Sequence, residues 1–408
     1  MTKKSDAPAI RFKGFSGAWE QRKAIDIADY SKGNGYSKGD LTDAGTPIIL
    51  YGRLYTKYQF AISEVDTFAF PQNGAVYSQG NEVIVPASGE TAEDIARASA
   101  VEKSGVLLGG DLNILRPFDF INPLFLALAI SNGEPQKELA KKAQGKSVVH
   151  IHNTDIQEVT IAYPSRTEQD RIVSVFRQLD NLITLHQRKF EKLTNVKKSM
   201  LEKMFPQNGS SYPEIRFKGF TDPWEQRKVG DLLIERNQQA PMSDEYPLMA
   251  FIANEGVAPK GERYDRSALV TDTVNKLYKK TEKGDFIYSS NNLETGSIGL
   301  NKYGKACISP VYSIFEPTGI ADSDFLGRRL VRKDFINAMV KWRQGVIYGQ
   351  WRIHESDFLK IEIPVPSVEE QRKIGAYLDQ LDNLITLHQR ELEKLQNIKK
   401  SMLEKMFV

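Results

Sequence analysis

The sequence has little of several features that would assign it to a familiar class of protein. It contains one cysteine, Cys307, so no disulfide framework can form within the chain, and this fits a reducing cytoplasm. Its apolar run at residues 120–130 is shorter than the roughly 20 residues that span a bilayer and predicts a buried helix. The first ten residues lack the apolar core of a signal sequence. We therefore expect a cytoplasmic protein without a membrane partner.

The sequence also lacks an excess of charge of either sign. Lys and Arg number 55 against 52 for Asp and Glu, which leaves a formal net charge of +3 over 408 residues. This balance neither favours nor excludes nucleic acid, so local surface patches would have to provide any DNA contact. The length predicts two or three domains with room for true hydrophobic cores.

Complete catalytic motifs are missing as well. NPLF at residues 122–125 is similar to the string with which amino-group DNA methyltransferases hold a base, but Leu124 replaces the second proline. No glycine-rich loop is available for S-adenosylmethionine, so the simpler interpretation is a helix with Pro123 in its first turn. GKS at residues 145–147 lacks the glycine that a phosphate-binding loop needs five residues earlier, where Ala140 stands. The five histidines have no cysteine pair beside them, so we expect no catalytic residue, metal site or bound cofactor.

What the sequence does contain is a long internal repeat. Residues 168–205 and 370–407 are identical at 27 of 38 positions and share the block LDNLITLHQR. Their apolar residues step by three and four, which predicts the seam of a heptad coiled coil along a helix of roughly 57 Å. The seam consists of Ile172, Phe176, Leu179, Ile183, His186, Phe190 and Leu193 in the first copy and of Ile374, Leu378, Leu381, Ile385, His388, Leu392 and Leu395 in the second.

A histidine occupies one seam position in each copy. His186 and His388 are predicted to fix the partner and register of the helices, as polar seam residues commonly do. The alternative is an exposed position without a special role. One such helix exposes an apolar stripe, and its twin is the obvious cover.

A second repeat shows that the whole chain is two tandem units. Residues 8–23 (PAIRFKGFSGAWEQRK) return at residues 213–228 as PEIRFKGFTDPWEQRK, and we call each copy the opening motif. Short β-prone runs and helical segments follow each copy, which predicts two similar α+β domains. The predicted divisions are a first domain at 1–165, a long helix at 166–205, a linker at 206–214, a second domain at 215–363 and a long helix at 364–408.

Two regions combine basic, aromatic and amide residues with glycine. Arg and Lys neutralise phosphates, while Asn, Arg and Tyr in loops can reach base edges, although many such stretches are simply solvated loops. The candidate DNA-binding residues are Lys32, Asn34, Tyr36, Lys38, Arg53, Tyr55, Lys57 and Tyr58 in the first unit and Arg263, Tyr264, Arg266, Lys276, Tyr278, Lys279, Asn291, Asn292, Lys302, Tyr303 and Lys305 in the second.

This duplicated layout resembles the specificity subunit of type I restriction-modification systems. The resemblance covers essentially the whole chain and rests on the alternation of variable regions with repeated helices. It also rests on EQ at 168–169 and 370–371, QLD at 178–180 and 380–382, and the KKSMLEKMF ends.

The resemblance implies that each globular region is a target recognition domain for one half of a split sequence in double-stranded DNA. The two helices would pack antiparallel as a spacer with a pseudo-two-fold arrangement. Two modification subunits would dock there and methylate adenine with S-adenosylmethionine, and restriction subunits in the full complex would use ATP and Mg. No catalysis would then reside in this chain. The chief alternative is a duplicated coiled-coil adaptor that binds only proteins, which the near-neutral charge supports.

Helical spacing yields a first test. Inserting about four residues, one helical turn, between Leu179 and Met200 should lengthen the unread spacer of the DNA target without changing either half-site. Sequencing the methylated sites of cells that carry the variant would measure both features. An altered half-site with an unchanged spacer would contradict this interpretation.

Overall fold

A computed structural model of the chain describes residues 8–145, 148–207, 209–259, 276–345 and 351–407. They form two compact units. Unit 1 comprises residues 1–187 and 390–408, and unit 2 comprises residues 188–389. Within the described ranges, no helix combines the length and the apolarity that crossing a bilayer requires.

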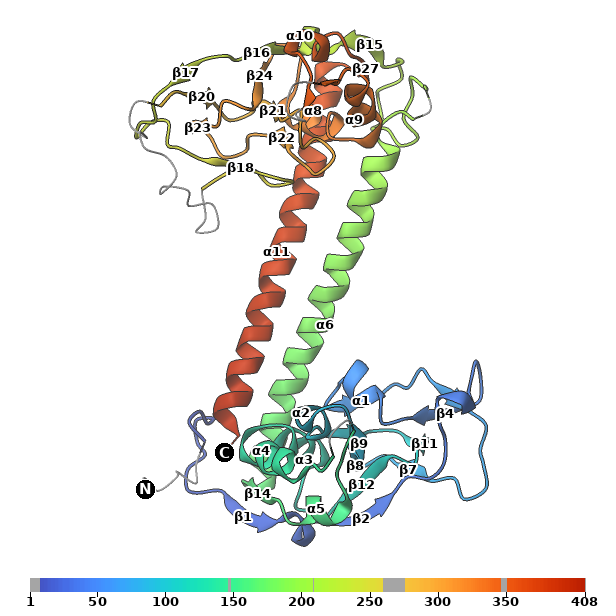
Figure 1. The fold of residues 1–408 in the computed structure, drawn as a ribbon. Coiled ribbons are helices and arrows are strands. Elements are labelled where there is room, and N and C mark those ends of the chain that lie inside the picture. The colour runs from blue at the N-terminus through green and yellow to red at the C-terminus, as the bar shows by residue number, and fades with distance from the viewer. Residues whose placement is uncertain (1–7, 146–147, 208, 260–275, 346–350, 408) are drawn as a thin grey trace. The chain divides into compact units, whose positions relative to one another are not determined.

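The two predicted long helices are present (Figure 1). Helix α6 spans Arg166–Lys203 and helix α11 spans Val368–Met406. Each helix begins in one unit and ends in the other, because the units divide near residues 187 and 389. The compact units therefore do not follow the predicted domain limits, since the helices belong to the units and form no separate domain.

Unit 1 contains two five-stranded mixed sheets. Their orders are β2-β12-β8-β10-β5 and β3-β6-β4-β11-β7, with parallel pairing only between β10 and β5 and between β11 and β4. The strands of the first sheet are β2 (Ala28–Lys32), β5 (Ala61–Ile62), β8 (Glu82–Pro86), β10 (Ser99–Val101) and β12 (Leu112–Pro117). Those of the second are β3 (Leu41–Thr42), β4 (Thr46–Ile49), β6 (Phe68–Ala69), β7 (Tyr77–Gln79) and β11 (Ser104–Leu108).

Two strand pairs and five short helices complete unit 1. The pairs are β1 (Glu20–Lys23) with β14 (Thr160–Tyr163) and β9 (Ser88–Gly89) with β13 (Val149–His150). The helices are α1 (Arg53–Thr56), α2 (Ala92–Ile95), α3 (Pro123–Ile130), α4 (Gly133–Lys142) and α5 (Asn153–Gln157). Helix α3 is the predicted buried helix, and its last six residues are all buried.

The described residues of unit 2 follow the same plan, with one four-stranded and one three-stranded sheet. One sheet has the order β16-β24-β21-β22 and the other β17-β20-β23. Their strands are β16 (Leu233–Glu235), β17 (Gln239–Ala240), β20 (Tyr278–Thr281), β21 (Phe286–Tyr288), β22 (Ile298–Leu300), β23 (Ala306–Ile308) and β24 (Ser313–Pro317). Further pairs are β15 (Glu225–Lys228) with β27 (Glu362–Val365), β18 (Ala250–Ile252) with β19 (Gly256–Ala258) and β25 (Gln344–Gly345) with β26 (Trp351–Arg352). The helices are α7 (Val229–Leu232), α8 (Ser323–Arg329), α9 (Lys333–Val340) and α10 (Glu355–Phe358).

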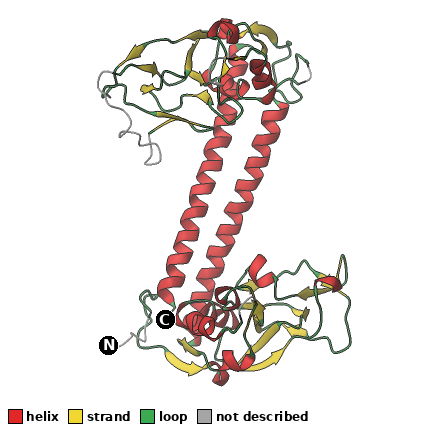
Figure 2. Ribbon diagram, in the orientation of Figure 1, coloured by secondary structure: helices red, strands yellow, loops and turns green. Residues whose placement is uncertain are grey.

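In both units several short helices lie beside the long helices, and part of the sheet structure extends away from them (Figure 2). In unit 1 the extended part is the sheet with β4, β7 and β11, and in unit 2 it is the sheet with β17, β20 and β23 (Figure 1). We call these two sheets the distal sheets. The mixture of strands and helices confirms the predicted α+β class with two similar domains.

The end of each long helix completes a hydrophobic core. In unit 1 the ring of Phe407 lies 5.8 Å from that of Phe125 and 6.1 Å from that of Phe176. In unit 2 the ring of Phe205 lies 5.5 Å from that of Phe325 and 6.1 Å from that of Trp224. Phe205 and Phe407 are 202 residues apart, so both units bury the same residue of the repeat.

Within each unit the two helix segments also form one equivalent ion pair. Lys399 of α11 contacts Asp180 of α6 at 2.5 Å in unit 1, and Lys197 of α6 contacts Asp382 of α11 at 2.5 Å in unit 2. In unit 1, Phe176 contacts Phe407 and Asp180 contacts Lys399. The residue numbers rise along α6 and fall along α11, so these two helix segments run antiparallel.

The predicted seam is buried unevenly. Its first residues in each helix are buried because they pack into the core of the unit in which that helix begins: Ile172, Phe176 and Leu179, and Ile374, Leu378 and Leu381. The remaining seam residues are half-buried: Ile183, His186, Phe190, Leu193, Ile385, His388, Leu392 and Leu395. The proposed role of His186 and His388 in fixing register stays a prediction.

The aromatic contact at the helix end yields a stability test. Phe205→Ala should lower the free energy of unfolding by about 3–5 kcal/mol, because it empties a site in which the side chain is 1% exposed. Tyr212→Ala, at a residue that is 53% exposed, should change stability by less than about 0.5 kcal/mol. Urea unfolding of both variants measures the difference, and equal losses would contradict the assigned core.

Candidate nucleic-acid interface

The predicted DNA-binding residues of unit 1 lie around its distal sheet. Lys32 ends β2, and the following loop leads to β3, while Arg53 begins α1 directly after β4. Lys32 and Lys38 are exposed. The loop between them is therefore the best placed of the predicted segments to meet a phosphate backbone.

This loop is held firmly to the strand turn beside it. The N–H of Gly110 donates to the carbonyl of Gly35 at 2.7 Å, and a Cβ at Gly33 would lie 1.8 Å from the carbonyl oxygen of Gly109. Only glycine permits such a close approach of two backbones. The predicted glycine-rich segment is thus a rigid support for the lysines.

Side chains fix the same loop from within. The amide of Asn34 donates to the carbonyl of Gly74 at 2.8 Å, and the hydroxyl of Tyr36 accepts from the N–H of Gln72 at 2.8 Å. The N–H of Ser37 donates to Asp40 at 2.6 Å, and this bond helps to lower the pKa of that carboxyl. Asn34 and Tyr36 therefore shape the loop, whereas Lys32 and Lys38 face outward.

The second predicted segment of unit 1 is bound mainly to the protein itself. Arg53 and Lys57 contact Asp66 at 2.6 and 2.5 Å, and their hydrogen bonds hold the pKa of that carboxyl well below its usual range. Tyr55 donates to the carbonyl of Ser88, and Tyr58 donates to that of Ala98 at 3.3 Å. These contacts explain the basic and aromatic mixture by packing, although they do not test DNA contact.

In unit 2 the predicted residues are dispersed. Tyr278 and Lys279 are buried in strand β20 of the distal sheet, and Lys276 is exposed just before it. Lys305 contacts Glu245 at 2.5 Å, while Lys302 contacts Asp379 of α11 at 3.1 Å. Arg263, Tyr264 and Arg266 lie outside the described residues.

The remaining predicted residues follow β21 and β22. The side-chain oxygen of Asn291 accepts from the N–H of Trp351 at 2.6 Å, and Asn292 lies exposed beside it. Tyr303 is also exposed. The structure therefore does not bring all the unit 2 candidates to one surface.

Sequence reasoning missed the antiparallel pair of strands β25 and β26. Trp351 is 49% exposed, and the guanidinium of Arg343 lies 6.0 Å from its ring centre. An exposed aromatic face with a neighbouring cation can stack on a base. A sequence feature could have drawn attention to this segment, because the Gln-Gly pair at 344–345 repeats the pair at 144–145.

The string NPLF has a structural explanation. The side chain of Asn122 caps α3 by accepting from the N–H groups of Leu124 and Phe125, and it donates to Asp170 at 2.7 Å. Pro123 stands in the first turn, as predicted. These bonds occupy the amide of Asn122 with the start of a helix.

Comparison with known proteins now adds the family. The type I restriction modification DNA specificity domain matches the chain twice, over residues 17–195 and 221–397. The chain belongs to this family. Both matches include a distal sheet and most of one long helix, so the repeat read from the sequence is the repeat of the family.

Individual relatives agree with this assignment. A specificity subunit named for the type I restriction enzyme MjaX of Methanocaldococcus jannaschii is 26% identical over 312 residues, which cover 73% of this chain and 70% of that protein. The MjaVIII specificity subunit of the same organism is 23% identical over 355 residues, with 81% and 79% coverage. The crystal structure of the type I S subunit from M. genitalium has a TM-score of 0.60 at 16% identity and covers 98% of this chain and 99% of its own, so the fold is shared.

Within this specificity-subunit family member, the framework beneath the variable loops is duplicated. The side chain of Gln169 binds the N–H of Asn122 at 2.7 Å and the carbonyl of Pro164 at 2.9 Å. Gln371 binds the N–H of Asp322 at 3.0 Å and the carbonyl of Pro366 at 3.0 Å. The repeated EQ motif thus fixes the start of each long helix to the domain that it leaves.

The contrast between free and bound lysines can be tested on DNA. The chain in complex with modification subunits should bind DNA less tightly as salt rises. Lys32→Ala and Lys38→Ala should each make this dependence shallower, reducing the absolute slope of log affinity against log salt by about 1, because each removes one proposed phosphate contact. Lys57→Ala should leave that slope unchanged, since Lys57 contacts Asp66. Fluorescence anisotropy of a labelled duplex over a range of salt concentrations measures the slopes. An equal effect of Lys57→Ala would contradict the placement.

Proposed function

We propose that this chain is the DNA sequence-specificity subunit of a type I restriction-modification complex in which each unit reads one half of a bipartite target. The observation that supports this most strongly is a duplicated framework that carries different loops. Three kinds of contact are equivalent in both units: the ion pairs Arg11–Glu168 and Arg216–Glu370, the bonds of Gln169 and Gln371, and the packing of the phenylalanines at the helix ends. The segments around the distal sheets differ in sequence.

The distal sheets are the proposed reading surfaces. Loops can present a few side chains to base edges in a groove, while surrounding cations contact phosphates without reading sequence. Lys32 and Lys38 in unit 1 and the ring of Trp351 in unit 2 have the exposure for these roles, whereas Arg343 beside Trp351 is paired with Glu294 at 2.9 Å. Because the loops differ between the units, the two half-sites should differ as well.

The long helices are the proposed spacer and part of the docking surface for two modification subunits. Leu182 and Leu185 are 43% and 47% exposed, and the equivalent Leu384 and Leu387 are 43% and 53% exposed. Exposed apolar side chains that recur at matching positions mark a surface for a protein partner. Identical surfaces in two repeats suit two copies of the same partner.

Catalysis belongs to the partners in this proposal. The modification subunits would bind S-adenosylmethionine and methylate adenine, and restriction subunits would use ATP and Mg to translocate and cleave DNA. This chain would bind none of these cofactors. Its contribution is the choice of sequence and the spacing of the two half-sites.

Domain exchange tests the proposal. Replacing residues 24–150 with the same region of a relative should change one half-site of the methylated sequence and leave the other half-site and the spacer unchanged. Methylome sequencing of cells carrying the complete system reads all three features. An equal change in both half-sites would refute the modular assignment.

A binding assay separates the proposal from a protein-only adaptor. With a modification subunit present, the chain should retain a DNA duplex with steep salt dependence. Complex assembly without any retention of DNA would favour the adaptor.

A further inference from the structure

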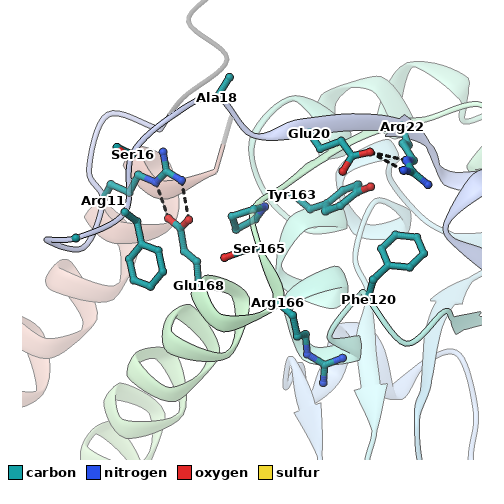
Figure 3. Close-up of a pocket in the computed structure, with 13 residues that line it drawn as sticks. Arg11, Ser16, Ala18, Glu20, Arg22, Phe120, Tyr163, Ser165, Arg166 and Glu168 are labelled. Carbon is teal, nitrogen blue, oxygen red and sulfur yellow. Dashed lines mark hydrogen bonds and ion pairs between the residues drawn. The ribbon is translucent and has the colours of Figure 1, made fainter.

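An open cavity lies where the opening motif of unit 1 meets the start of α6 (Figure 3). It has a volume of about 610 Å³ and is lined by the opening motif, the end of β14 and the first turn of the helix. Unit 2 has a cavity of about 360 Å³ at the equivalent place. All 13 residues that line the first cavity have counterparts in the lining of the second, and eight are of the same type.

Buried ion pairs build both cavities. Arg11 contacts the two carboxylate oxygens of Glu168 at 2.6 and 2.7 Å, as the dashed lines in Figure 3 mark, and Arg216 contacts Glu370 at 2.8 Å through both oxygens. Glu168 and Glu370 are each 1% exposed. These pairs hold the opening motif against the helix start, so their retention in both repeats follows from the fold.

The rim of each cavity carries a more exposed ion pair, and in unit 1 the guanidinium of Arg22 also lies 5.3 Å from the ring centre of Phe120. Glu20 and Arg22 contact one another at 2.6 Å with side chains 53% and 44% exposed. Glu225 and Arg227 repeat this pair at 2.6 Å with exposures of 68% and 41%. All four residues stand on strands whose side chains face solvent almost throughout. The exposed pairs recur at equivalent places in the two repeats, so both cavities present the same polar groups to a partner.

The floor of each cavity is apolar. Phe120 is 38% exposed in the first and Ile320 is 45% exposed in the second. A proline also lines each cavity, Pro164 in unit 1 and Pro366 in unit 2. The two cavities thus offer the same chemistry, an apolar floor beside a glutamate–arginine pair.

We propose that each cavity receives the same segment of a modification subunit, one copy per unit. This rests on the function proposed above, in which two identical partners assemble with one chain. An apolar side chain of the segment would cover Phe120 or Ile320, and its polar groups would bond the adjacent Glu–Arg pair. The two half-sites of the DNA should differ, whereas two copies of one subunit are identical. Two cavities with the same Glu–Arg pair and an apolar residue beside it therefore suit the two copies better than the two half-sites.

The charges of the cavities favour a protein over the DNA backbone. In unit 1 the three cations that line the cavity, Arg11, Arg22 and Arg166, are each paired with a carboxylate, namely Glu168, Glu20 and Asp170. In unit 2 the carboxylates of Asp222, Glu225 and Glu370 outnumber the guanidinium groups of Arg216 and Arg227. Phosphate binding draws on uncompensated cations, and carboxylates beside them repel phosphate.

Charge reversal at the rim tests the proposal. Glu20→Arg and Glu225→Arg each change an exposed residue, so the melting temperature should stay the same. We expect each single variant to bind one modification subunit normally and the other at least about tenfold more weakly, and the double variant to bind both more weakly. Native mass spectrometry and titration with the modification subunit of the same host measure stoichiometry and affinity. The matched control is Glu64→Arg with Glu255→Arg, an exposed glutamate of each unit outside the cavities, which should bind as the wild type does.

A second pair of variants removes the floor. Phe120→Ser with Ile320→Ser should weaken binding of the modification subunit in the same way while leaving the rim charges in place. Unchanged binding of two subunits by both double variants would overturn the proposal. Tighter binding of a DNA duplex by the charge-reversed chain, without loss of modification subunits, would also overturn it and would assign the cavities to DNA.

Measurements on the wild-type complex distinguish a failure of the cavity assignment from a failure of the proposed function. If the wild-type complex methylates a bipartite site and the double variants do so equally well, only the cavity assignment fails. If the wild-type chain binds modification subunits but no DNA, the proposed function fails whatever the variants do.

Discussion

The phenylalanine near the end of each long helix inserts into the core of the unit in which the other helix begins. Phe407 packs on Phe125 and Phe176 in unit 1, and Phe205 packs on Trp224 and Phe325 in unit 2. Unit 2 is the continuous segment 188–389, but the core of unit 1 is completed by Phe407, which comes from the second of the two segments that form this unit. Folding of unit 1 therefore requires residues from both ends of the sequence, a long-range closure that slows folding and makes the two helices necessary to both units.

Many of the basic side chains of this chain are ion-paired within its own fold. Arg53 and Lys57 bind Asp66, Lys305 binds Glu245, and Arg328 binds Asp379 and Asp382 of α11. These cations support the fold and contribute little uncompensated charge for phosphates. DNA affinity would then depend on a few outward lysines and on the partners in the complex, which suits a subunit that should not hold random DNA by itself.

Internal repetition made the framework predictable from the sequence. The heptad spacing, the EQ motif and the opening motif each occur twice, so the long helices, their starts and the similarity of the two units could be foreseen. The proline of NPLF likewise predicted the start of α3 correctly. The division of the helices between two compact units could not be read, because a heptad pattern shows that a stripe is covered but does not show what covers it.

The residues that would contact DNA were much harder to predict from the composition of the sequence. A basic and aromatic segment has the same sequence signature whether it meets DNA or packs on its own domain, as Arg53 and Tyr55 do. The cavities escaped notice for a related reason, since their lining comes from segments as distant as Glu20 and Glu168. Only the fold brings such segments together.

The shared helix ends also affect how such a chain can evolve. Both units receive the same terminal sequence, KKSMLEKMF, so a globular region need keep only the contacts around Phe125 or Phe325 to accept it. Trp19 and Trp224, each packed edge-on against that phenylalanine, belong to the retained opening motif. A region between these fixed points can be exchanged by recombination if it also keeps its ion pairs with the helices, such as that of Arg328 with Asp382 of α11, and a new specificity could then arise in a single step.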